Sequence, residues 1–163
     1  MEATSILPQG EYKSFGNLWK RGVASIADGF VLGVPYMLIV IFFLLINKEA
    51  SLDMSSLSFQ QSLWFLMLAI LFQFVIPAIY FTYMVGKYGM SLGKKALNLR
   101  IFNEDGSEVN YKKAFFRYLC FFLYSIPFLG LVLFIVSVIL VIVDPKKQAL
   151  HDKLCKTVVL FKH

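Results

Sequence analysis

An aspartate inside an apolar segment is the residue of this chain with the clearest chemical potential. Asp28 lies in an apolar run that extends from about residue 23 to residue 46. A carboxylate at the centre of a membrane helix costs about 2.5–3.5 kcal/mol on insertion scales, so it needs a partner, water or a proton. Arg21 precedes it by seven residues, about two helical turns and ~10 Å along the axis, on nearly the same face. Arg21 and Asp28 are therefore the first candidates for an ion site.

Two interpretations of Asp28 follow from these residue types. In the functional one, Arg21 and Asp28 line a polar cavity, and Asp28 takes up a proton or a cation. In the structural one, Asp28 is neutralised by Arg21, by Arg117 or by a lysine of the tail, and only fixes helix packing. Both interpretations fit the residues.

Other polar residues beside the apolar segments are weaker candidates. Gln73 and Pro77 predict a polar kink that either faces the same cavity or satisfies backbone groups between helices. In the C-terminal tail, Asp144 and Asp152 alternate with basic residues, a pattern typical of charges that pair at a membrane surface. Asp152 is a further candidate for the ion site, and Arg117 and Asp144 are candidate charge partners.

Several classes of function are not expected. His151, Asp152 and Cys155 are close in sequence, but a metal needs three or four ligands at suitable spacing, and the only other histidine is His163. No Ser/His/Asp or Cys/His arrangement stands out, so we expect neither an enzyme nor a cofactor. The net charge of +6 comes from basic residues that flank apolar runs, so we expect no nucleic-acid partner.

The composition indicates a membrane protein. Of the 163 residues, 58% are hydrophobic and 16% are charged, against roughly 45–50% and about 25% in soluble domains. A soluble fold of this size has too little interior for so many apolar side chains. The length suits one domain, which we take as residues 1–163.

Two helices are expected to cross the bilayer, at about residues 22–46 and 62–85. Each is long enough for a hydrocarbon core of ~30 Å. The loop between them is short and polar and contains Lys48, Glu49 and Asp53.

A third apolar stretch, at about residues 114–143, allows two arrangements. A single crossing would put the basic segment before it and the lysine-rich tail after it on opposite sides, against the positive-inside tendency. Pro127 and Gly130 provide a break, so we favour a hairpin of short helices at about residues 113–125 and 129–143, the first tilted or re-entrant. Both termini are then cytoplasmic.

Short strands are expected in the cytoplasmic segments. Residues 96–102 alternate apolar and polar side chains, an Asp-Gly turn follows, and residues 107–111 can return. Residues 156–161 are β-branched and aromatic. The expected fold class is thus an all-α polytopic membrane protein with three to four transmembrane or re-entrant helices and a small cytoplasmic β segment.

The basic segment after the second helix looks at first like a phosphate loop. Its glycines and lysines, from Gly86 to Lys95, have the wrong spacing for that motif, and no strand precedes them. We expect these lysines to meet anionic lipid headgroups instead.

Four motifs, in order, resemble the RDD family of small membrane proteins. They are R-x-x-A-x-x-x-D from Arg21 to Asp28, a segment from Ser91 to Ile101 similar to the family's T-x-G-K-x-x-x-G-x-x-V, a basic residue at Arg117, and an ending from Lys147 to Val159 similar to R-x-x-x-H/G-D…T-V-V. Ser91 stands for the usual Thr and Asn98 for a usual Gly. The resemblance makes Asp152 the second family aspartate, with Asp144 as the alternative.

The resemblance implies transport, of cations or protons, in a bacterial-type plasma membrane. The first hypothesis is a proton- or cation-coupled transporter that uses Asp28 with Arg21 and Asp152, and its few spans would then require a homo-oligomer. The alternative is a non-enzymatic partner that tethers or inhibits another membrane protein through its cytoplasmic segments.

Overall fold

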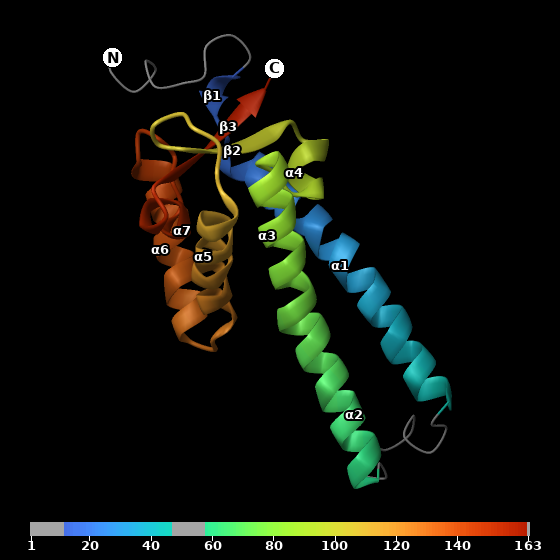
Figure 1. The fold of residues 1–163 in the computed structure, drawn as a ribbon. Coiled ribbons are helices and arrows are strands. Elements are labelled where there is room, and N and C mark those ends of the chain that lie inside the picture. Colours follow the sequence, from blue (N-terminus) through green and yellow to red (C-terminus); the bar gives the residue numbers. More distant parts are fainter. Residues whose placement is uncertain (1–11, 47–57, 163) are drawn as a thin grey trace. The chain divides into compact units, whose positions relative to one another are not determined.

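The structure is a computed structural model that describes residues 12–46 and 58–162, and it is mostly helical with one small sheet (Figure 1). Within these residues the chain forms two compact units. One contains residues 12–28 and 80–162, and the other contains residues 29–46 and 58–79. The expected loop residues Lys48, Glu49 and Asp53 lie outside the described part.

Two helical segments are long and apolar enough to cross a membrane. The first is α1 (Leu18–Ile46), with 29 residues, and the second is the 30-residue segment Phe59–Tyr88. The second segment comprises α2 (Phe59–Ile70), the π-helical turn η3 (Leu71–Val75) and α3 (Ile76–Tyr88). Gln73 lies in the π-helical turn, and such turns absorb an extra residue within a helix.

The second unit is built from parts of these two helices. Tyr36 contacts Phe72 with ring centroids 5.5 Å apart, and Phe43 contacts Phe65 at 5.7 Å. Ser58 starts α2 with a capping box, in which it exchanges hydrogen bonds with Gln61. Large apolar side chains are exposed along both segments, which suits a lipid environment.

The third apolar stretch is a bent helix pair. Helix α5 (Tyr111–Phe122) continues into the 3₁₀ turn η4 (Leu123–Ser125), and α6 (Leu129–Val143) leaves at 119° to it. Phe128 has a positive φ of 61°, and the Leu129 N–H bonds the Pro127 carbonyl at 2.7 Å, which makes a tight γ-turn. A Cβ on Gly130 would overlap the Tyr124 carbonyl oxygen, so the turn requires glycine there.

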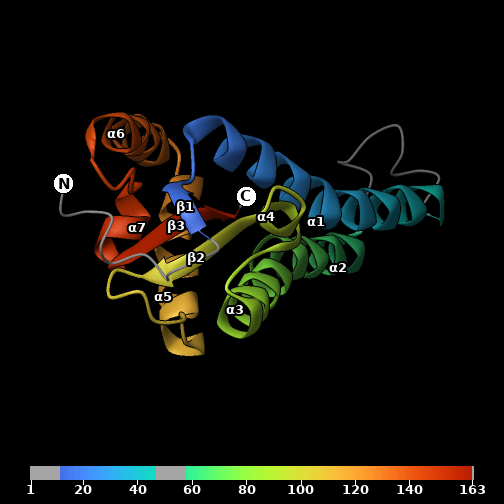
Figure 2. The ribbon, with the colours of Figure 1, turned by 90° about the horizontal axis from the view of Figure 1, so that it is seen from above.

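Three antiparallel strands form a sheet in the first unit. The order is β1 (Tyr12–Phe15), β3 (Thr157–Lys162) and β2 (Leu99–Asn103), so the last strand lies between the other two (Figures 1 and 2). Ile101 pairs with Val159, and Phe15 pairs with Leu160. The sheet places apolar side chains on both faces. One cluster contains Ala24, Val85, Leu99, Ile101, Val109, Ala114 and Val159, and the other contains Phe102, Val158 and Leu160.

The strands differ in part from those expected. The strand expected at 96–102 begins at Leu99, because Ala96 ends the short helix α4 (Leu92–Ala96) and Asn98 has a positive φ of 55°. The strand expected at 107–111 is absent. A single bridge joins Glu108 to Phe102, and the Asn110 side chain then caps α5. The strand expected at 156–161 is β3, and β1 was not anticipated.

Candidate functional site

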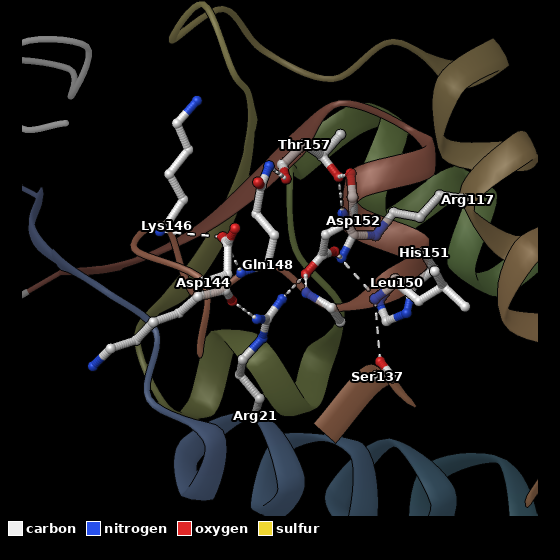
Figure 3. Close-up of polar contacts among 12 residues, drawn as sticks. Arg21, Arg117, Ser137, Asp144, Lys146, Gln148, Leu150, His151, Asp152 and Thr157 are labelled. Carbon is white, nitrogen blue, oxygen red and sulfur yellow. Dashed lines mark hydrogen bonds and ion pairs between the residues drawn. The ribbon is translucent and has the colours of Figure 1, made fainter. Parts of the chain in front are cut away.

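Asp152 lies at the centre of a buried ion-pair cluster (Figure 3). It sits on the short helix α7 (Leu150–Leu154), and its side chain is fully buried. Arg21 of α1 binds one carboxylate oxygen, and Arg117 of α5 binds the other. The Ala149 N–H also donates to the carboxylate, at 3.1 Å. Asp152 therefore joins three helices through one side chain.

The two arginines have further partners that fix their direction. Arg21 donates to the Lys147 carbonyl at 2.5 Å, and Arg117 donates to the Thr157 hydroxyl at the start of β3. Gln148 donates to the Thr157 carbonyl at 2.9 Å and to Glu104 at 2.7 Å. The central strand of the sheet is thus tied to the same cluster as the helices.

Burial and charge act in opposite directions on Asp152. Burial alone would raise the pKa of this carboxyl, but the Arg117 and Arg21 guanidiniums hold that pKa well below its usual range. His151 lies beside it, with Nε2 3.3 Å from the carboxylate. Burial, against the pull of Asp152, lowers the pKa of His151 to about 3, so the imidazole is neutral at pH 7.

Asp28 lies in a separate set of contacts. Its exposed fraction is 2%, and it accepts three hydrogen bonds: from the Tyr80 hydroxyl at 2.9 Å, the Ser91 hydroxyl at 2.5 Å and the Gly93 N–H at 2.8 Å. Among the described residues, Asp28 has no ion-pair partner. The carboxylate is held by neutral donors from α3 and from the start of α4.

Each of the two hydroxyl groups around Asp28 also accepts a hydrogen bond from a backbone N–H. Tyr80 accepts the Leu92 N–H at 2.9 Å, and Ser91 accepts the Lys94 N–H at 3.4 Å. Both hydroxyl groups donate to Asp28, which is the acceptor in all three of these hydrogen bonds. A change in the charge of Asp28 would require these hydroxyl groups to turn.

The spacing Ala24-x-x-x-Asp28 matches the turn at Ser91–Gly93. A Cβ on Gly93 would overlap the Ala24 carbonyl oxygen, so this residue must be glycine for α4 to reach α1. Ala24 is fully buried at the contact. The small residue permits the approach, and the aspartate one helical turn later fixes it by hydrogen bonds.

The structure separates residues that sequence reasoning had grouped together. Arg21 forms its ion pair with Asp152 of α7 and not with Asp28. The Asp28 carboxylate instead accepts hydrogen bonds from the Tyr80 and Ser91 hydroxyl groups. Asp144 pairs with Lys153 at 2.6 Å and accepts hydrogen bonds from the Lys146 and Gln148 N–H groups, which follow α6. Gln73 belongs to the second unit and is exposed there.

Several partners were not foreseen from the sequence. Tyr80 looks like an ordinary residue of an apolar helix, and no pattern in the sequence marks it. Thr157 is marked only as the first residue of the T-V-V motif. Ser91 and Gly93 lie in the segment that looked at first like a phosphate loop and in the second family motif, and neither pattern predicts a contact with Asp28. The signal that could have found them is the pair of small residues, Ala24 and Gly93, which predicts a close backbone approach.

The two clusters lie on the motifs that pointed to a family. The profile described as the RDD family matches residues 15–156. The chain belongs to the RDD family. Two similar proteins are from Bacillus subtilis (strain 168): "Uncharacterized protein YckC", 30% identical over 92% of this chain and 86% of its own length, and "Uncharacterized protein YxaI", 28% identical over 88% and 95%. No solved structure matches the chain.

The RDD motifs acquire physical roles in this fold. The arginine of the first motif and the aspartate of the last, Arg21 and Asp152, form one ion pair, and Arg117 completes it. The aspartate of the first motif, Asp28, fastens the Ser91–Gly93 turn of the second motif. Each motif is therefore half of a contact whose other half is distant in sequence.

Proposed function

We propose that this RDD-family protein is a proton- or cation-coupled membrane transporter in which Asp28 binds and releases the ion. The observation that supports the proposal is a buried carboxylate, within an apolar helix, that has only neutral donors around it. A charge held in this way in an apolar helix is costly, and such residues commonly mark ion pathways. The hydroxyl groups of Tyr80 and Ser91 can rotate as the ion arrives or leaves.

The second cluster has a supporting role in this proposal. Arg21, paired with Asp152, sets the positive potential near Asp28 and so tunes its affinity for a cation. Two or three membrane spans are not enough to enclose an ion pathway in a monomer, so the transporter is a homo-oligomer in the plasma membrane. Both termini are cytoplasmic, and no enzymatic step is involved.

The test is ion flux in proteoliposomes with the full chain, a pH-sensitive dye and a series of monovalent cations. Asp28→Asn should abolish cation-dependent proton movement, and Tyr80→Phe should weaken it. Glu108→Gln is the matched control, since this exposed carboxylate pairs only with Arg100 among the charged groups that the structure describes. Unchanged flux in correctly inserted Asp28→Asn protein would eliminate the mechanism.

A second candidate is a non-enzymatic partner that tethers or inhibits another membrane protein. The observation that favours it is the small sheet, whose strand β3 is held to the ion-pair cluster by hydrogen bonds. Thr157 of this strand is bonded by Arg117 and Gln148, so the sheet offers an ordered surface for a partner. Photo-crosslinking from Asp105, in the turn after β2, tests this function in native membranes. A crosslinked product of one defined mass supports it, while crosslinks to lipid alone count against it.

A further inference from the structure

Within the described part of the chain, one cationic side chain near Asp28 has no hydrogen-bond or ion-pair partner. Lys94 follows Gly93 directly, and Gly93 lies against Ala24 and Asp28 of α1. Its backbone N–H bonds Ser91, but its ammonium makes no hydrogen bond or ion pair with any residue that the structure describes. Lys94 is half-buried, whereas the next residue, Lys95, is exposed.

Positive charge is in excess around Lys94. The charged groups that act on it come from three elements: Arg21 and Asp28 of α1, Arg117 of α5, and Asp152 of α7. His151, also on α7, is neutral at pH 7. With Lys94 itself, this makes three cations and two carboxylates. One of the carboxylates, Asp152, is already shared by the two arginines.

Burial, together with the nearby Arg117, lowers the pKa of Lys94 to about 8. A half-buried ammonium in this setting is short of a counter-charge. An anion that binds beside it regains the free energy that the excess positive charge costs.

The surroundings indicate which anion is available. Helix α3 ends at Tyr88, six residues before Lys94, and its last turns carry a lysine between two tyrosines. The Lys87 ammonium donates to the Tyr83 hydroxyl at 2.9 Å and lies 5.4 Å from the Tyr88 ring centroid. Lysine and tyrosine side chains in this arrangement are typical of the headgroup level of a membrane, where phosphate is the abundant anion.

We propose that Lys94 binds a phosphate group, with the positive potential of Arg21 and Arg117 behind it. The phosphate belongs either to an anionic phospholipid headgroup or to free phosphate at the same membrane face. This proposal does not rest on ion transport by Asp28. It would also distinguish Lys94 from Lys95, although the two are neighbours in one basic segment.

Competitive amine labelling tests the proposal on the full, unmodified chain. The protein is reconstituted in phosphatidylcholine vesicles, in the same vesicles with phosphatidylglycerol, and in phosphatidylcholine vesicles with inorganic phosphate. Brief treatment with acetic anhydride, followed by mass spectrometry, gives the acetylation rates of Lys94 and Lys95. Lys95 corrects for the general effect of surface charge on the reaction, because it meets the same surface and the same bulk solution.

Phosphatidylglycerol should slow Lys94 relative to Lys95 by about fivefold, which corresponds to ~1 kcal/mol of binding free energy beyond the general surface attraction that Lys95 reports. Relative slowing by inorganic phosphate alone would identify free phosphate as the ligand. A Lys94-to-Lys95 ratio that stays the same in all three samples would overturn the proposal. Neither result depends on whether the vesicles carry ion flux.

Discussion

At the residue scale, two buried aspartates meet the same problem in different ways. Asp152 is neutralised by two arginines, whereas Asp28 is held by two hydroxyl groups and one backbone N–H. The Arg117 and Arg21 guanidiniums hold the pKa of the Asp152 carboxyl low enough that it stays ionised over the physiological pH range, and loss of one partner would leave a buried charge uncompensated. For Asp28, which has neutral donors, we propose exchange of a proton or a cation. The two RDD aspartates therefore have distinct roles, one structural and one proposed for transport.

Removal of the Asp152 charge should destabilise the protein strongly. Asp152→Asn leaves the buried Arg117 without its counter-ion, and loss of one partner of a buried pair costs about 3–5 kcal/mol. Asp144→Asn should cost about 1 kcal/mol or less, since its ion pair is with the more exposed Lys153. Denaturant unfolding in detergent measures both. If both variants lose the same free energy of unfolding, Asp152 contributes no more to stability than Asp144 does.

His151 should make stability depend on pH between about 6.5 and 4. The unfolded chain takes up a proton on this histidine near pH 6.5, whereas the folded pKa is about 3. The unfolded state binds more protons in this window, so stability falls as the pH falls, with a slope that approaches ~1.4 kcal/mol per pH unit. Stability is retained above pH 6.5.

Thermal unfolding in detergent across this pH range checks the expectation. His151→Gln should flatten the curve between pH 6.5 and 4, whereas His163→Gln, the comparison variant, should leave it unchanged. A wild-type curve that is already flat in that window would show that the imidazole is protonated in the folded state.

At the element scale, short helices fasten the long ones to the sheet. Helix α4 is fixed to α1 at Asp28, and α7 is fixed to α1 and α5 at Asp152. Each of these two helices has only five residues, and an isolated helix of that length is not stable in water because helix nucleation is unfavourable. Their order comes from tertiary contacts, and the two aspartates supply the decisive ones.

The contact between α4 and α1 should require a residue without a side chain at position 93. In Gly93→Ala the Cβ would overlap the Ala24 carbonyl, so α4 would have to move and the Asp28 hydrogen bonds would be lost. We expect a loss of about 1–3 kcal/mol, as for other overpacked sites. Gly22→Ala in α1 is the control, since its Cβ would have nothing within 4 Å and alanine favours helix. Similar melting temperatures for both variants would refute the close approach.

At the scale of the whole molecule, the bent pair α5 and α6 decides how the ends are arranged. Two helical segments can span a membrane, or three if the bent pair counts as one span. If the pair returns to its starting side, β2 and β3 lie on one side of the membrane, as their pairing in a single sheet requires. A straight third span would separate strands that are hydrogen-bonded to each other.

Cysteine labelling in intact cells should reveal this arrangement. In a background with Cys120 and Cys155 replaced by serine, Asp105→Cys and Lys162→Cys should be protected from a membrane-impermeant maleimide. Asp53→Cys, between the first two spans, should react. Reaction at Lys162→Cys but not at Asp105→Cys would mean that the third stretch crosses the membrane once.

The sequence by itself determined the elements whose cause is local. Apolar length predicts the helices at 22–46 and 62–85, and α1 and the segment Phe59–Tyr88 extend them by only a few residues. Pro127 marks the break between α5 and α6, because proline disfavours a continuous helix in any surroundings, and Gly130 permits the close approach of the Tyr124 carbonyl. The motifs also identified the RDD family.

Only the tertiary structure decided which charge meets which. Arg21 and Asp28 are close along one helix, yet Arg21 pairs with Asp152, which is 131 residues away. Sequence spacing reports neighbours within an element, but the pairing of buried charges depends on which elements pack together. The same reason explains three features that the sequence did not predict: strand β1, the absence of a strand at 107–111 and the role of the Tyr80 hydroxyl. Each depends on whether the fold places a hydrogen-bonding partner beside it.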